Sequence, residues 1–265
     1  MKKQPIEDLI HFAMDFIKNF GKEALSYYGK GKSLVKFDEG LVTEAELHLT
    51  EYFRKQLNEN FPEHRIFQSD REDKDYTHDE KRYQWIFDPL DGVANFQAGI
   101  PIWGMSLSLF ENFWPIFGIF YMPATGDIFS ARAGDKAFWG DREIHISSQE
   151  NVNDESVLLI YSRFHQNYHS TFPGKIRNLG CTAAHISYVA MGRAEAAVIS
   201  NESFQDLAAA WIIIEAAGGK FYRMDGTEFL LGEYLDVQKG GDHLLVAAPY
   251  SYAQIRDCMK KSSSK

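Results

Sequence analysis

The chain has 265 residues, 45% of them hydrophobic and 14% aromatic, so it can bury a core as one large domain or two intimately packed ones. Its net charge of −9 argues against nucleic acid or an anionic membrane as a main partner. For the same reason, a phosphate ligand would need a metal ion between itself and the acidic protein. Cys181 and Cys258, without C-x-x-C spacing, suggest neither a disulfide framework nor a zinc site. Charged residues interrupt the apolar pattern of residues 1–20, so we expect a cytoplasmic protein without a membrane span.

Two helices and a set of strands are predicted for the first half. Apolar residues at helical spacing predict a helix over residues 6–20, ended by Gly21. A capping box formed by Thr43 and Glu46 begins a second helix, which ends before Pro62. A charged stretch from Asp70 to Lys81 is typical of a solvated loop. Strands are expected at Arg65–Phe67, Gln84–Phe87, Met105–Phe110, Ile116–Tyr121 and Asp127–Ala131. A sheet packed against two helices is implied.

The second half alternates strand and helix patterns, which favours an α/β layer. Helices are expected at Thr182–Met191 and Asp206–Ala217, and strands at Val157–Tyr161, Ala194–Ile199, Lys220–Arg223 and Leu244–Ala247. We divide the chain into an N-terminal α+β part, residues 1–146, and a C-terminal α/β part, residues 147–265.

The most informative segment is Asp88-Pro89-Leu90-Asp91-Gly92, which follows the apolar run Trp85-Ile86-Phe87. It places two carboxylates at the expected end of a buried strand, and Mg²⁺ prefers oxygen ligands. Proline cannot continue a ladder, so we expect the chain to turn at Pro89 and to aim Asp88, the Leu90 carbonyl and Asp91 at one point. The same residues are also a good ordinary turn sequence.

A third carboxylate, Asp206, opens an almost entirely apolar helix, whose N-terminus should therefore point into the protein. One interpretation is an ordinary N-cap residue that accepts hydrogen bonds from the first helical N–H groups. The other is a third metal ligand that joins Asp88 and Asp91.

Two motifs carry a resemblance to a known family. The pattern W-x-x-D-P-x-D-G-x-x-N-F at Trp85–Phe96, together with Asp206–Gly219, resembles the two signatures of the inositol monophosphatase family of Mg²⁺-dependent phosphomonoesterases. Cys181-Thr182-Ala183-Ala184 looks like its G-T-A-A substrate loop. The resemblance implies a layered αβαβα sandwich of the inositol monophosphatase and fructose-1,6-bisphosphatase type, usually a homodimer.

The resemblance also implies roles for individual residues. It makes Asp88, the Leu90 carbonyl, Asp91 and Asp206 the ligands of two or three Mg²⁺ ions, which would neutralise the phosphate, activate a water and stabilise the leaving alkoxide. The backbone N–H groups of Gly92, Val93 and Ala94 would hold the phosphate at a helix start. The substrate-binding residues would be Thr182, Ala183, Ser200 and Asp206.

The chain departs from the family where the attacking water is prepared. The family's G-E-E segment reads Gln68-Ser69-Asp70-Arg71 here. An ungapped alignment puts Ser69 at the catalytic position, but one inserted residue puts Asp70 there, and we favour Asp70 as metal ligand and catalytic residue. Val93 replaces a threonine that orients the water, and Glu46 replaces its aspartate partner. We expect Asp70, Glu46 and Asp91 to act in catalysis; the alternative is a catalytically impaired member that binds a ligand or regulates.

The natural substrate is less readable from the sequence. The family's inositol-binding glutamate falls at Ile199, and Gln205 replaces the tryptophan before the metal aspartate. His185 and Tyr188 follow the substrate loop and could contact a substrate, although packing roles are commoner for such residues. Inositol phosphate is thus one candidate beside sugar phosphates, fructose bisphosphate, histidinol phosphate and phosphonucleotides.

Overall fold

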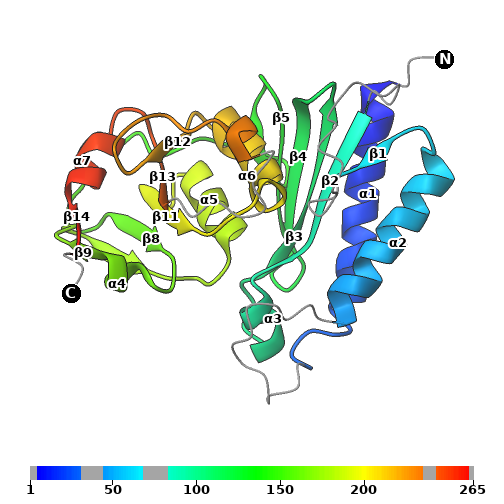
Figure 1. The fold of residues 1–265 in the computed structure, drawn as a ribbon, viewed down its shortest axis with the longest axis horizontal. Coiled ribbons are helices and arrows are strands. Elements are labelled where there is room, and N and C mark those ends of the chain that lie inside the picture. The colour runs from blue at the N-terminus through cyan, green and yellow to red at the C-terminus, as the bar shows by residue number, and fades with distance from the viewer. Residues whose placement is uncertain (1–4, 31–43, 68–82, 235–242, 263–265) are drawn as a thin grey trace.

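The computed structural model describes residues 5–30, 44–67, 83–234 and 243–262 and shows five layers, helix–sheet–helix–sheet–helix (Figure 1). The expected αβαβα sandwich is confirmed. The predicted Thr43, Ser69 and Asp70 lie outside the described residues.

The first sheet has its strands in chain order, with β1 parallel to β2 and each later neighbour antiparallel. Its strands are β1 (Arg65–Ile66), β2 (Tyr83–Asp91), β3 (Gly104–Glu111), β4 (Trp114–Met122), β5 (Asp127–Arg132), β6 (Ala137–Trp139) and β7 (Arg142–Ile144). The five strands expected from the sequence are present within a few residues, and β6 and β7 extend the sheet further.

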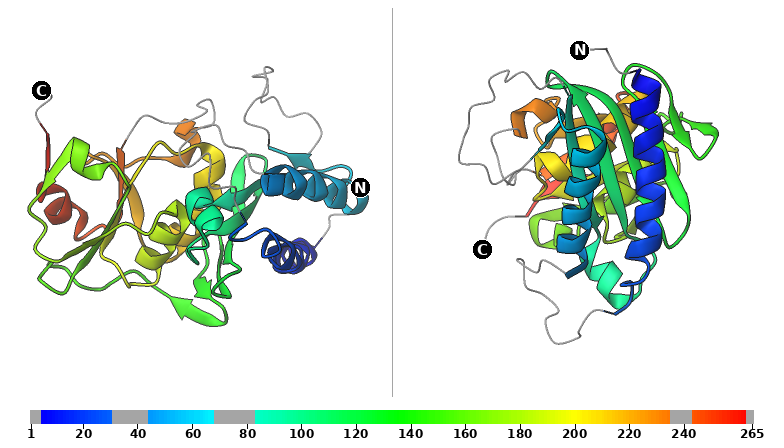
Figure 2. Two further views of the ribbon diagram at one scale, coloured as in Figure 1. Left: turned by 90° about the horizontal axis from the view of Figure 1, so that it is seen from below. Right: turned by 90° about the vertical axis from the view of Figure 1, so that its right-hand side faces the viewer.

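Two helices, α1 (Ile6–Ala24) and α2 (Glu44–Asn60), lie side by side over one face of this sheet, as the right-hand view of Figure 2 shows. Their apolar faces share one core with β2, β3 and β4. The predicted helix end at Gly21 is wrong, because α1 continues through it to Ala24. A Cβ at Gly21 would collide with the Tyr121 ring, so glycine allows α1 to approach β4 closely.

The second sheet has the order β10-β8-β11-β13-β12. Its strands are β8 (Val157–Ile160), β10 (Lys175–Arg177), β11 (Ala196–Ser200), β12 (Lys220–Arg223) and β13 (His243–Ala247). The remaining elements are α3 (Val93–Ala98), α4 (Phe164–Asn167), β9 (Tyr168–Ser170), α5 (Thr182–Ala190), α6 (Phe204–Ala216), η1 (Leu231–Tyr234), α7 (Tyr252–Asp257) and β14 (Met259–Lys261). Helices α5 and α6 fill the space between the sheets (Figure 1), which explains why α6 is apolar on nearly every side.

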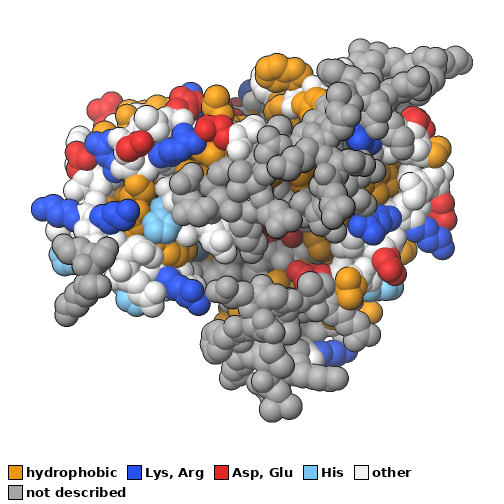
Figure 3. All heavy atoms as spheres, viewed as in Figure 1, with side chains coloured by type: hydrophobic (Ala, Val, Ile, Leu, Met, Phe, Trp, Pro, Cys, Tyr) orange, Lys and Arg blue, Asp and Glu red, His pale blue; other side chains and the backbone are white. Residues whose placement is uncertain are grey.

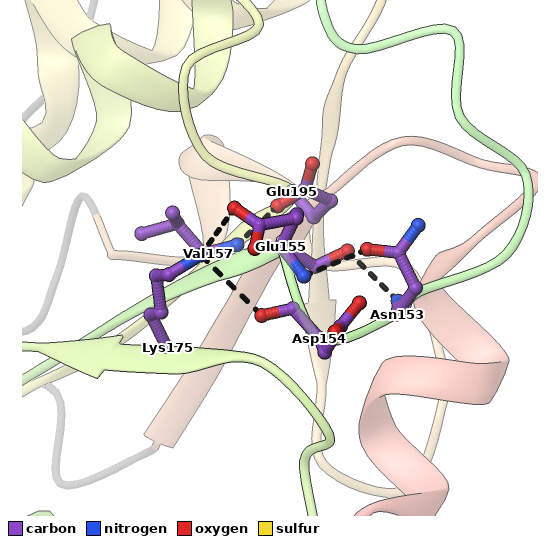
Figure 4. Close-up of polar contacts among 7 residues, drawn as sticks. Asn153, Asp154, Glu155, Val157, Lys175 and Glu195 are labelled. Atoms are coloured by element: carbon purple, nitrogen blue, oxygen red, sulfur yellow. Dashed lines mark hydrogen bonds and ion pairs between the residues drawn. The ribbon is translucent and has the colours of Figure 1, made fainter.

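Polar contacts fix the start of β8 (Figure 4). The Val157 N–H donates to the Glu195 carboxylate, and the Lys175 ammonium group lies 2.5 Å from the Glu155 carboxylate. Both contacts join segments that are distant in sequence, so β8 is held at its beginning by its neighbours. The opposite end of β8 leads into the polar pocket described below.

Charged side chains of both signs lie on the face that Figure 3 shows. Lys and Arg side chains are visible at both ends of this face, and Asp and Glu side chains lie among them. Lys260 and Lys261 of β14 are also exposed.

The predicted turn at Pro89 is wrong, because β2 runs through this residue to Asp91. Asp88 pairs with Ser106 and Asp91 pairs with Gly104, so three steps along β2 match two along β3. This extra residue makes a β-bulge, which accommodates a proline that cannot donate to the ladder. Bulges re-aim nearby side chains, and this one lies between the two carboxylates of the motif.

Candidate active site

Asp88 is a buried carboxylate at the bulge, with 7% of its surface exposed. Its Oδ1 accepts a hydrogen bond from the Leu90 N–H at 3.2 Å. Burial raises the pKa of Asp88 well above its usual value, and repulsion from Asp206, Asp91 and Glu46 raises it further. The four predicted acidic residues therefore lie within electrostatic reach of one another, although they come from α2, β2 and α6.

Asp91 faces the N-terminus of α5. Its Oδ1 accepts from the Thr182 N–H at 3.2 Å, and its Oδ2 accepts from the Ala183 N–H at 2.5 Å and from the Cys181 thiol at 3.3 Å. Burial raises the pKa of Asp91, but these hydrogen bonds lower it and so oppose that effect. The D-P-x-D-G motif is thereby joined directly to the predicted substrate loop.

Asp206 is the third residue of α6, which starts at Phe204, two residues earlier than expected. Ser203 is the N-cap: its Oγ accepts from the Asp206 N–H at 3.3 Å, while Asp206 Oδ2 accepts from the Ser203 N–H at 2.8 Å. Asp206 is thus the acidic partner of a capping box rather than the N-cap itself. The neighbouring Gln205 Nε2 donates to the Phe87 carbonyl at 2.8 Å, which ties α6 to β2.

Among the residues that the structure describes, no three His, Cys, Asp or Glu side chains converge as ready metal ligands. Asp88, Asp91 and Asp206 each accept a backbone N–H instead. The chemistry of the set nevertheless suits a hard divalent cation, because its donors are carboxylate oxygens. A cation would also offset the repulsion that raises the pKa of Asp88.

The predicted phosphate-binding segment is the turn into α3. Gly92 is the helix N-cap with a φ of 85°, and Val93 packs against the core under α1 and α2. Asn95 Nδ2 in α3 donates to the Ile102 carbonyl at 2.6 Å and to the Leu179 carbonyl at 2.7 Å. The helix start predicted at Gly92 is therefore present and is tied to the segment that precedes α5.

A polar pocket of about 540 Å³ lies beside Asp91's partners on α5. Two of the predicted substrate-binding residues, Thr182 and Ser200, line it, whereas Ala183 and Asp206 are not among its lining residues. Asn201 and Glu202, next to Ser200, also line it. The sequence did not single out the polar lining residues that come before α5: Tyr161, Ser162, Arg163, Asn167 and Asn178. A run of polar residues directly after β8 was the available signal, because loops at the ends of strands commonly form binding sites.

The alignment position of the family's inositol-binding glutamate does not face this pocket. Ile199 is buried in the core beneath α5 and α6, since successive residues of β11 alternate between the two faces of its sheet. The acidic residue of the pocket is Glu202, whose Oε1 accepts from the Thr182 hydroxyl at 2.7 Å.

The two residues after the substrate loop have separate environments. His185 lines the polar pocket, but its Nε2 accepts the Leu179 N–H at 2.9 Å and burial lowers its pKa to about 4. Tyr188 instead lines a mainly apolar hollow of about 500 Å³ together with Leu179 and Met191. Only His185 is therefore placed to meet a ligand in the polar pocket.

The profile of the inositol monophosphatase family matches residues 6–249. The chain belongs to the inositol monophosphatase family. Its predicted membership of a family of metal-dependent phosphomonoesterases is thus confirmed. None of the described helices is long and apolar enough to cross a membrane.

Several relatives of this inositol monophosphatase family member are phosphatases by name. The histidinol-phosphatase of Chlorobaculum parvum is 28% identical over 232 residues, covering 84% of this chain and 88% of that protein. An inositol-1-monophosphatase of Mesorhizobium japonicum is 29% identical over 163 residues, covering 58% of this chain and 61% of that protein, which is less than two thirds of its length. The solved IMPase of Thermotoga maritima has a TM-score of 0.78 at 22% identity, over 95% of this chain and 96% of its own, and shares the fold.

Proposed function

We propose that this protein hydrolyses a small phosphomonoester with Mg²⁺ as its cofactor. The observation that carries the proposal is a group of three carboxylates, the buried Asp88 and the partly buried Asp91 and Asp206, beside a polar pocket and a helix start. A site of this kind offers oxygen ligands to a cation and backbone N–H groups to a phosphate.

The metal ligands in this proposal are Asp88, the Leu90 carbonyl, Asp91, Asp206 and Asp70. Bound Mg²⁺, as two or three ions, would supply positive charge to the phosphate and the leaving oxygen and would lower the pKa of water. The four carboxylates of the set would otherwise repel a phosphate dianion, which is why the acidic site requires the cation.

The other residues bind and orient the substrate. The N–H groups of Gly92, Val93 and Ala94 hold the phosphate at the start of α3, while Glu46 and Asp70 accept hydrogen bonds from the attacking water. Thr182, Ala183, Ser200 and Asp206 bind the alcohol part of the substrate.

We infer that the alcohol is a small polyol, a sugar or an amino alcohol. The pocket is lined by hydroxyl, amide, carboxylate and guanidinium groups, which suit a hydroxylated or charged molecule better than an apolar one. Names of relatives give the candidates: inositol monophosphate, histidinol phosphate and fructose 1,6-bisphosphate.

A second candidate is a family member that binds such a ligand without turning it over. Val93 favours this candidate, since its side chain packs into the core under α1 and α2 and has no hydroxyl to orient a water. Loss of such positioning typically costs ~10²–10⁴-fold in rate.

The test is phosphate release from a panel of inositol, sugar, histidinol and nucleotide monophosphates and fructose 1,6-bisphosphate, with and without Mg²⁺, using Asp88→Asn as blank. Activity that needs Mg²⁺ and vanishes in the blank supports the enzyme and ranks its substrates. No release by the wild type, together with release by Val93→Thr, would support the non-catalytic candidate. Retained turnover in Asp88→Asn contradicts the proposed site.

We also propose a cytoplasmic homodimer with the two parts, residues 1–146 and 147–265, noted above. The homodimer rests on the family resemblance alone. Light scattering on the purified protein should give twice the 30.3 kDa chain mass, and a monomer mass would contradict it.

A further inference from the structure

Cys181 makes an uncommon contact for a helix N-cap. It is the N-cap residue of α5, and its thiol donates to Asp91 Oδ2 at 3.3 Å. The thiol is buried, with 2% of the residue exposed, and it comes from a position ninety residues away in the chain. Tertiary packing therefore places the Cys181 thiol, a weak hydrogen-bond donor, against one particular oxygen, Oδ2, of the proposed metal ligand Asp91.

The three donors around Asp91 are divided unequally between its two oxygens. A carboxylate has about four lone-pair positions, two on each oxygen. Oδ2 receives both the Ala183 N–H and the Cys181 S–H, whereas Oδ1 receives only the Thr182 N–H. Oδ2 is thus saturated, and the one lone pair left by these three bonds is on Oδ1.

This division bears on which cation Asp91 can hold. Ca²⁺ takes six to eight oxygens and commonly binds both oxygens of a carboxylate, while Mg²⁺ demands octahedral geometry and usually takes one. An Asp91 that offers Oδ1 alone can bind a cation through one oxygen, as Mg²⁺ usually does, but not through both oxygens, as Ca²⁺ commonly does. The Cys181 hydrogen bond is the part of this arrangement that a side-chain substitution can remove, since the other two donors are backbone groups.

We propose that the Cys181 thiol, by occupying Oδ2 of Asp91, restricts this carboxylate to one metal-binding oxygen and so makes the site discriminate against Ca²⁺ in favour of Mg²⁺. Cys181 is a positioning residue in this scheme, because it acts on the cation through Asp91. The inference rests on the cation binding of the proposed function but not on turnover.

The first test is calorimetric titration of the metal-free protein with Mg²⁺ alone and with Ca²⁺ alone. Cys181→Ala frees a lone pair of Oδ2, so the ratio of the Ca²⁺ to the Mg²⁺ dissociation constant should fall ~3–10-fold, the range expected for one net hydrogen bond. Cys181→Ser keeps a donor at the same position and should hold the ratio within about twofold of the wild type. Cys258→Ala, which removes the other thiol far from Asp91, is the matched control and should leave the ratio unchanged.

The second test does not depend on metal affinity or on the stability of the alanine variant. The chain has two cysteines, so Cys258→Ala leaves Cys181 as its one thiol, and the infrared S–H stretching band then reports on that group alone. A thiol that donates to a carboxylate should absorb at lower frequency than a free thiol, and Asp91→Asn should move the band upward.

The outcomes separate this inference from the proposed function. An S–H band at the free-thiol frequency, or an equal metal ratio in wild type and Cys181→Ala, overturns the role of Cys181 even if the protein is an active phosphatase. A lowered ratio in Cys181→Ala that Cys181→Ser restores supports the role even if no substrate is hydrolysed. Absence of any Mg²⁺ or Ca²⁺ binding by the wild type overturns both.

Discussion

Replacing Gly92 by alanine should destabilise the protein, by an amount that depends on the backbone conformation and on the atoms around this residue. Its φ of 85° lies in the left-handed region, where a residue with a Cβ costs ~1–2 kcal/mol. A Cβ there would also lie 3.1 Å from the Cys181 Cβ, 3.1 Å from the Ile102 carbonyl oxygen and 3.2 Å from the Trp103 Cα. Two of these neighbours are backbone atoms, so relief requires the chain to shift, at ~1–3 kcal/mol for overpacking. We expect Gly92→Ala to lower the free energy of unfolding by ~2–5 kcal/mol.

The control is Gly126→Ala. Gly126 has a similar φ of 80°, but nothing lies within 4 Å of the position that a Cβ would take. Both variants lose the same unfolded-chain entropy, so the difference between them isolates the contacts at Gly92. Urea unfolding of the metal-free proteins should show Gly92→Ala less stable than Gly126→Ala by ~1–3 kcal/mol. Equal stability of the two variants would refute the claim that the motif, the 102–103 segment and the start of α5 are closely packed at this point.

Two further predictions concern buried titratable groups. Asp88→Asn should raise the free energy of unfolding of the metal-free protein at pH 7, because it removes a buried charge repelled by Asp206 while Asn keeps an oxygen for the Leu90 N–H. Since the pKa of Asp88 is raised in the folded state, the wild-type protein should gain stability relative to Asp88→Asn as the pH falls through that pKa and the carboxylate becomes neutral. Thermal unfolding in a chelator from pH 8 to pH 4 should therefore show the stability difference between the variant and the wild type shrinking. A difference that stays constant with pH would contradict this. Burial lowers the pKa of His185 from 6.5 to about 4, so the folded state favours the neutral imidazole. The stability that this neutral side chain contributes is fully present above pH 6.5 and is lost as the pH falls from 6.5 to 4. Urea unfolding should show a loss of up to ~3 kcal/mol over that window that His185→Gln does not share, and parallel pH profiles would contradict it.

Local patterns were enough to predict most of the elements. The strand Lys220–Arg223 has the predicted bounds, and α6 follows from a long apolar run ended by glycines. These features depend on side-chain periodicity and on residues within a few positions of each other, which the sequence contains directly. The carboxylates Asp88, Asp91 and Asp206 could also be singled out, because their motifs are short and contiguous.

The errors arose where a residue's role depends on a distant neighbour. Gly21 looks like a helix end, but the nearby Tyr121 ring makes it a packing residue within α1. Pro89 looks like a turn, but β3 pairs on both sides of a bulge and keeps β2 continuous. Ile199 was not an error of this kind: it stands at the alignment position of the family's inositol-binding glutamate but is apolar, and the alternation of β11 places its side chain in the core.

By itself, the sequence determined a sheet packed against helices, the buried nature of the helix after Asp206 and the residues that can offer oxygen to a cation. It could do so because hydrophobic periodicity and short motifs are properties of neighbouring residues. The layered αβαβα class was implied by the resemblance of its two motifs to those of the inositol monophosphatase family. Only the tertiary structure decided that Asp91 meets Cys181, Thr182 and Ala183 across ninety residues, and that Glu202 rather than Ile199 faces the polar pocket. Those contacts depend on the packing of α5 and α6 between two sheets, which fixes distances that no local pattern encodes.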